Sequence, residues 1–91
     1  MDNYEYSPQE LKIIVDIANK HKIPISIGND WSSLGEDSVI IHSKLDFTPL
    51  LIFSIRGFNL LVGFDFNSLD YYEEIVKYSK IFMQEKVEFK I

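Results

Sequence analysis

PLLIFSIRGFNLLVGFDF, residues 49–66, is the densest run of large apolar side chains in this sequence. A helix that crosses a membrane needs about 20 predominantly apolar residues, but Arg56 and Asp65 interrupt this run. A glycine follows the arginine, at a place where a tight turn is needed. The stretch therefore predicts a β-hairpin with strands over residues 49–55 and 59–66 and a turn at the Arg-Gly-Phe sequence.

The two strands of this hairpin differ in the character of their faces. The first is nearly apolar on both faces, which is typical of a central strand. The second has one uninterrupted apolar face, on which we expect the helices to dock. That face comprises Phe58, Leu60, Val62, Phe64 and Phe66. The opposite face is mixed and comprises Asn59, Leu61, Gly63 and Asp65. On that side we expect Leu51, Phe53 and Ile55 to form an apolar patch that needs a cover.

The chain before the hairpin begins with a strong helix signal. Ser7 and Glu10 are spaced as in a capping box, and Pro8 suits the first helical position. Apolar residues then recur at helical spacing. We predict a helix over residues 8–21, stopped by Pro24, which disfavours helical geometry in the residue before it.

Three further strands and a second helix complete the predicted pattern. Residues 23–27 alternate as a short strand, and the proline within it, which has no N–H to donate, places that strand at an edge. Residues 38–43 form another short strand. After the hairpin, Asn67 or Ser68 caps a second helix. Residues 86–91 alternate between charged and apolar side chains, which predicts a half-exposed terminal strand.

The predicted order of elements is therefore α-β-β-β-β-α-β. A chain of 91 residues has room for one core, because independent domains cluster around 100 to 150 residues. We predict a single α+β domain over residues 1–91. It has one mostly antiparallel sheet of about five strands, with two helices on one face.

Charge and composition disfavour several functions. Fourteen acidic residues stand against nine basic ones, so the net charge is −5. Such a surface repels nucleic-acid phosphates and anionic lipids, and we expect direct contact with neither nucleic acid nor membrane. The chain has no cysteine, which excludes disulfides and thiolate chemistry. The beginning MDNYEYSPQE is acidic where a secretory signal is basic and then apolar, which favours a cytoplasmic location.

The groups that carry catalysis in most enzymes are sparse. Phosphate-binding loops, nucleophile elbows and HExxH motifs are missing from the sequence. His21 lies at a predicted helix C-terminus, where a structural role suffices. His42 lies in a strand without a second ligand at metal-binding spacing. Arg56, the only arginine, either binds an anion or is simply solvated at the hairpin turn. We expect no enzymatic activity and no cofactor.

The loop between the two short strands, GNDWSSLGEDS, is the first candidate binding site. Trp31 is either an anchor for a protein partner or a plug over the open end of the sheet. Asp30, Glu36 and Asp37 carry its negative charge. Their spacing does not match the twelve-residue calcium loop, so we expect no metal site. We interpret these carboxylates as an electrostatic patch for a basic partner.

The second helix is the other candidate binding site, because it combines tyrosines with an acidic face. Tyr71 and Tyr78 are expected on the surface together with Tyr4, and Glu74 belongs to the acidic face. Tyrosine supplies contact area in interfaces at a low entropy cost. Other tyrosines, Tyr6 and Tyr72, are expected to pack on the core.

These observations favour a small acidic binding protein that blocks a larger, more basic partner. Immunity proteins, antitoxins and phage-encoded inhibitors of host defence or CRISPR-type nucleases act in this way, so the partner is expected to be a nucleic-acid-processing enzyme. The predicted partner-binding residues are Asp30, Trp31, Glu36, Asp37, Tyr71, Glu74 and Tyr78.

Two alternatives remain open. The chain is a self-associating structural or regulatory subunit if an exposed strand edge, such as residues 86–91, pairs across a two-fold axis. It is expected to be a monomer or a homodimer. The second alternative is a small metal-dependent enzyme that uses Asp30, Glu36, Asp37 and His42.

Overall fold

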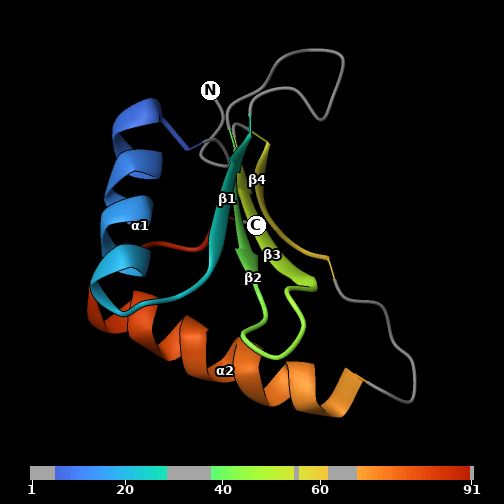
Figure 1. Cartoon of the computed structure of the whole chain (residues 1–91). Helices are drawn as coiled ribbons and strands as arrows, with labels where there is room; N and C mark the ends of the chain where they lie inside the picture. Colours follow the sequence, from blue (N-terminus) through green and yellow to red (C-terminus); the bar gives the residue numbers. More distant parts are fainter. Residues whose placement is uncertain (1–5, 29–37, 55, 62–67, 91) are drawn as a thin grey trace.

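The computed structural model describes residues 6–28, 38–54, 56–61 and 68–90. Its elements are α1 (Pro8–Lys20), β1 (Ile25–Gly28), β2 (Ser38–His42), β3 (Pro49–Ser54), β4 (Gly57–Leu60) and α2 (Ser68–Gln84). In Figure 1, α1 runs along the strands and α2 runs across one end of the sheet. The predicted α+β class is confirmed.

The four strands form one antiparallel sheet in the order β1-β2-β3-β4. Ser54 pairs with Gly57, so the predicted hairpin turns within two residues, slightly earlier than the sequence indicates. Gly57 has a φ of 101°, a conformation that a side chain would make costly. The edge position predicted for the first strand is confirmed, with its proline just before β1.

The core lies between the sheet and the two helices. Its fully buried sheet residues include Val39 and Ile41 of β2 and Leu51 and Phe53 of β3. The helices contribute Leu11, Ile14, Ile17, Ala18, Ile75, Tyr78 and Phe82. The prediction that Leu51 and Phe53 lie on the mixed face of the hairpin is wrong. Phe53 pairs with Phe58 and Leu51 pairs with Leu60, so both residues lie on the face that meets the helices.

A bulge explains why two consecutive leucines are buried together. Ile41 pairs with Leu51 but His42 pairs with Pro49, so Leu50 has no partner residue in β2. An extra residue of this kind bends the strand and breaks the alternation of faces. Leu50 and Leu51 are therefore both fully buried, although alternation places them on opposite faces.

The helix ends follow local rules. Both bonds of the predicted capping box are present, since Ser7 and Glu10 each accept from the backbone of the other. At the other end of α1, Lys22 has a φ of 58°, and Ile23 donates to the Ala18 carbonyl. This is a Schellman motif, in which lysine takes the position usually held by glycine. The Schellman motif therefore ends the helix at Lys20, several residues before Pro24, which the sequence predicted as the stop.

The C-terminal segment, residues 87–90, is not the predicted fifth strand. It has no ladder with the sheet among the described residues, and one backbone bond joins it to β4, from the Phe58 N–H to the Lys90 carbonyl (2.8 Å). Phe89 packs against Phe58 with ring centroids 4.9 Å apart. The segment thus covers the outer edge of β4 mainly through side-chain packing.

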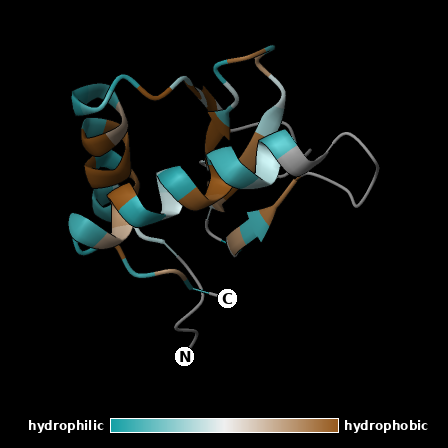
Figure 2. Ribbon diagram, turned by 90° about the horizontal axis from the view of Figure 1, so that it is seen from below, coloured by the Kyte–Doolittle hydropathy of each residue, from teal (hydrophilic) through white to brown (hydrophobic). Residues whose placement is uncertain are grey.

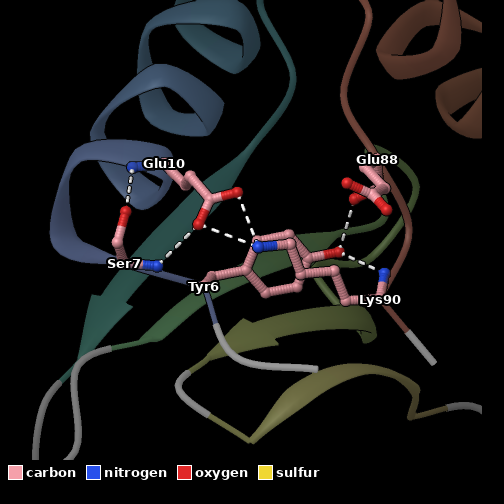
Figure 3. Close-up of polar contacts among 5 residues, drawn as sticks. All are labelled: Tyr6, Ser7, Glu10, Glu88 and Lys90. Atoms are coloured by element: carbon pink, nitrogen blue, oxygen red, sulfur yellow. Dashed lines mark hydrogen bonds and ion pairs between the residues drawn. The ribbon is translucent and has the colours of Figure 1, made fainter. Parts of the chain in front are cut away.

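The Tyr6 side chain bonds the backbone of this segment, as a neighbouring strand would do (Figure 3). Its hydroxyl donates to the Glu88 carbonyl (2.7 Å) and accepts from the Lys90 N–H (2.8 Å). The Lys90 ammonium lies 2.8 Å from a Glu10 carboxylate oxygen and 5.1 Å from the centre of the Tyr6 ring. Burial raises the pKa of Tyr6. We call Tyr6, Glu10, Glu88 and Lys90 the terminal clasp.

Removing the hydroxyl of the terminal clasp is expected to cost stability. In Tyr6→Phe, two backbone groups of residues 88 and 90 lose their partner, and we expect the free energy of unfolding to fall by about 1–3 kcal/mol. Urea denaturation measures this change, and faster hydrogen exchange at the Lys90 amide locates it. The control is Tyr71→Phe, whose hydroxyl bonds the exposed Asp46. Equal losses in both variants would contradict a special role for the clasp.

Candidate functional site

Residues 43–48 join β2 to β3 and rest on α2 (Figure 1). Glu74 of α2 holds the start of this β2–β3 loop. Its carboxylate accepts hydrogen bonds from the Ser43 hydroxyl (2.6 Å), the Lys44 N–H (2.7 Å) and the Tyr78 hydroxyl (2.6 Å). Burial raises the pKa of Glu74, but these hydrogen bonds outweigh it and lower the pKa below its ordinary value. Burial, together with the adjacent Glu74 carboxylate, raises the pKa of Tyr78.

A second contact holds the end of the loop. The Tyr71 hydroxyl donates to Asp46 and lies 3.3 Å from the Thr48 hydroxyl. Asp46 also accepts from the Thr48 N–H (3.0 Å). The bonds from Thr48 and Tyr71 lower the pKa of Asp46, so its carboxylate stays charged. The loop is thus tied to α2 at both ends.

The loop backbone is strained at Phe47, which has a φ of 62°. This conformation costs a bulky residue about 1–2 kcal/mol and persists only where the surroundings impose it. Here the Phe47 N–H donates to the Ser43 carbonyl (3.0 Å), and the Ser43 N–H donates to the Thr48 carbonyl (2.8 Å). The strain indicates a loop held in one conformation.

His42 contacts Phe47 through both its ring and a hydrogen bond. The two rings stack with centroids 3.9 Å apart and planes 6° apart. The His42 Nδ1 lies 2.9 Å from the Phe47 carbonyl, which only accepts, so Nδ1 carries a proton. In the neutral ring, Nε2 therefore accepts from the Ser26 hydroxyl at 2.7 Å. Both ring nitrogens of this buried histidine are occupied, and we assign it a structural role in positioning the loop.

The loop presents two large apolar side chains to solvent. Leu45 is 68% exposed and Phe47 is 54% exposed. A shallow depression of about 470 Å³ lies beside Leu45. Its lining residues are Lys44, Leu45, Asp70, Glu73, Glu74, Lys77 and Tyr78. We call Leu45 and Phe47, with the surrounding carboxylates of Asp46, Asp70 and Glu73, the loop surface.

The structure separates the predicted binding residues. Tyr71 and Glu74 lie together, but they face the β2–β3 loop and hold it. The expectation that Tyr78 lies on the surface is wrong, because it is 1% exposed and bonds to Glu74. The four predicted residues of the acidic loop, Asp30, Trp31, Glu36 and Asp37, lie outside the described residues, as does Tyr4.

The remaining residues singled out in the sequence are the histidine at the end of α1, the arginine at the hairpin turn and two tyrosines. His21 caps α1 and lies 3.0 Å from Glu85, which also binds Lys20 at 2.9 Å. The bonds from His21 and Lys20 lower the pKa of Glu85. Arg56 is exposed at the hairpin turn, as expected. Tyr6 is buried and Tyr72 is half-buried, which confirms that both pack on the core.

Leu45 and Phe47 are the site residues that sequence reasoning missed. Their signal is two large apolar residues in KLDFTP, a segment that is otherwise polar or turn-forming. The outer side of α2 is also mixed, and Figure 2 shows hydrophobic residues between its hydrophilic ones. Met83, for example, is 60% exposed.

In the part of the chain that the structure describes, neither helix combines the length and the apolar character that a bilayer crossing requires. No three side chains of His, Asp or Glu come together there as a metal site. Comparison of the whole chain with protein-family models, curated proteins and solved structures finds no match.

Proposed function

We propose that this chain is a cytoplasmic protein-binding module that occupies and blocks a larger, basic protein, as immunity proteins, antitoxins and phage-encoded nuclease inhibitors do. The observation that carries the proposal is the loop surface. Exposed Leu45 and Phe47 stand on a loop whose conformation is already fixed. A preformed loop binds more tightly because little conformational freedom is lost on association.

The chemistry of the loop surface indicates the kind of partner. Large apolar side chains that enter a pocket supply most of the affinity of an interface. The exposed residues Asp70 and Glu73 line the depression, and Asp46 is exposed on the loop next to Leu45. Lys44 and Lys77 offset part of this negative charge. With a net charge of −5 for the whole chain, this surface fits an apolar pocket rimmed by basic residues.

Within this proposal the predicted residues have different roles. Leu45 and Phe47 make the desolvated contact. Glu74 and Tyr71 position the loop and do not meet the partner with free polar groups. Asp70 and Glu73 steer the encounter, so they act on the association rate more than on the affinity. The acidic loop around Trp31 remains a predicted second contact.

A capture experiment followed by affinity measurement tests the proposal. The immobilised chain is exposed to a lysate of the organism that encodes it, at low and at moderate salt. We expect a basic protein to be retained. With that protein purified, Leu45→Lys is expected to weaken binding by about tenfold or more, since a desolvated anchor is worth at least about 1.4 kcal/mol.

The matched control for that measurement is Met83→Lys. Met83 is similarly exposed on α2 but lies outside the loop surface, so this variant is expected to bind like the wild type. Circular dichroism verifies that both variants are folded. Failure to retain a partner at either salt concentration would contradict the proposed function. Wild-type affinity in Leu45→Lys would contradict the loop surface as its site.

A further inference from the structure

The two edge strands of the sheet, β1 and β4, differ in what covers their outer side. The outer edge of β4 is covered by the C-terminal segment, through the bond from the Phe58 N–H to the Lys90 carbonyl. At the other edge, β1 pairs only with β2 among the described residues. Figure 1 shows β1 at the side of the sheet next to α1. Within residues 6–28, 38–54, 56–61 and 68–90, the sheet therefore has one edge without a covering segment, and that edge is β1.

The backbone groups that point outward from β1 follow from the register. The His42 N–H donates to the Pro24 carbonyl (2.9 Å), so residues 24 and 42 form a hydrogen-bonded pair. In an antiparallel ladder, hydrogen-bonded and non-hydrogen-bonded pairs alternate. Ser26 therefore bonds towards β2, whereas Ile25 and Ile27 direct their N–H and C=O groups away from the sheet.

This edge is short, but it lacks other features that protect natural edges, namely charges, internal prolines and bulges. β1 reads ISIG and pairs with β2 in a regular register. Ile27 is 69% exposed. Beside it, an apolar groove of about 490 Å³ separates α1 from the strands. Its lining residues are Pro8, Leu11, Lys12, Val15, Ile27, Gly28, Ser38 and Val39.

We propose that β1 pairs with β1 of a second copy, so that two sheets join into one across a two-fold axis at Ser26. Ile25 then lies opposite Ile27 of the second copy, and the reverse pair follows by symmetry. Each of the two pairs exchanges both of its N–H···O=C bonds, which makes four hydrogen bonds in total. This interface is separate from the loop surface and does not depend on the proposed function.

Self-complementarity is the reason for choosing a second copy as the occupant. A two-fold axis perpendicular to the sheet keeps the helix face of both copies on the same side. All four isoleucines then meet there, next to the groove of each copy. Lys12 lines this groove, and Asp16 follows it by four residues, on the same side of α1. In the proposed dimer the two α1 helices run antiparallel, so each presents this pair of opposite charges to the other.

The size of this contact sets the expected affinity. A four-residue strand with its groove is smaller than the roughly 800 Å² per partner of a standard interface. We therefore expect a reversible dimer with a dissociation constant on the order of 10–100 µM.

Sedimentation equilibrium of the full chain over about 1 µM to 1 mM tests the dimer. Ile27→Lys is expected to weaken association by about tenfold or more, because each Ile25–Ile27 pair would then place a charged ammonium group against an apolar side chain. The matched control is Ile13→Lys on α1, which is 53% exposed and lies away from this edge. It is expected to dimerise like the wild type.

A backbone variant separates strand pairing from simple apolar contact. Ile27→Pro removes an N–H that points outward, and proline is tolerated at such an edge position. We expect this variant to remain folded by circular dichroism and to lose the dimer. A wild-type chain that stays monomeric at the highest concentration would overturn the proposal, as would a dimer that persists in Ile27→Lys. If Ile27→Pro does not fold, the sedimentation result for Ile27→Lys decides whether the proposal holds.

Discussion

Replacing Phe53 by alanine is expected to lower the free energy of unfolding by about 3–5 kcal/mol. Phe53 is fully buried in β3 and joins both chain ends to the hairpin and α2. Its ring centroid lies 5.4 Å from Tyr6, 5.2 Å from Phe58, 5.5 Å from Phe82 and 6.0 Å from Phe89. Removing the ring leaves a cavity that so many rigid neighbours cannot fill. A domain of this size has a stability on the order of 5–10 kcal/mol, so this loss is a large part of its free energy of unfolding.

Chemical denaturation of the two proteins measures the effect of Phe53→Ala. The control is Leu60→Ala, which lies on the adjacent strand and the same face but is 48% exposed. We expect the control to lose less than about 1.5 kcal/mol, since much of its side chain already meets water. A loss at Phe53 no greater than at Leu60 would contradict its place at the centre of the core.

Glu74→Gln is expected to lower the free energy of unfolding by about 2–3 kcal/mol. A neutral amide has one oxygen and cannot accept from Ser43, Lys44 and Tyr78 together, whereas the carboxylate does. One of these donors is therefore left without its partner. The matched control is Glu73→Gln, which changes the same group at an exposed neighbouring position and should cost less than about 0.5 kcal/mol.

The effect of Glu74→Gln should depend on pH. Folding lowers the pKa of Glu74 from its ordinary value of 4.5, so the charged form is favoured in the native state. Such a group contributes its full stabilisation above its unfolded pKa and loses it as the pH falls through the folded pKa. We expect the stability difference between wild type and variant to be largest near neutral pH and to shrink below about pH 4.5.

Comparing the two proteins isolates Glu74 from the other acids. Glu10, Asp46 and Glu85 also have lowered pKa values, but all three are present in both proteins. Their shared contribution cancels in the difference. A difference that stays constant from pH 7 to pH 3 would show that the carboxylate charge of Glu74 is not what holds the loop.

The parts of the fold that sequence predicts well are those set by neighbouring residues. The capping box at Ser7 and the hairpin around Gly57 depend on contacts a few positions apart, and both are present. The errors involve contacts between distant segments. Residues 87–90 alternate like a strand, but Tyr6, more than 80 positions away, takes the place of a strand partner. The bulge at Leu50 depends on the register with β2, which alternation alone does not reveal.

The candidate site was predicted only in part, for the same reason. Helical spacing indicates that Tyr78 and Glu74 share one side of α2, but it does not show that the β2–β3 loop covers that side. Once Ser43 and Lys44 bind the carboxylate, the tyrosine hydroxyl below it can be buried without losing a hydrogen bond. The same covering loop turns Leu45 outward, into solvent.

The terminal clasp has a consequence for folding kinetics. Its bond from Tyr6 to Glu88 joins residues 82 positions apart, and closing so long a loop becomes favourable only after the chain between them is ordered. The clasp should therefore form late, and weakening it should speed unfolding more than it slows folding. Local opening of the clasp would also release Lys90 from the Phe58 N–H. In such an opened molecule, β1 and β4 would both be edge strands without a partner among the described residues. Since unpaired strand edges favour aggregation, we expect an intact clasp to limit it.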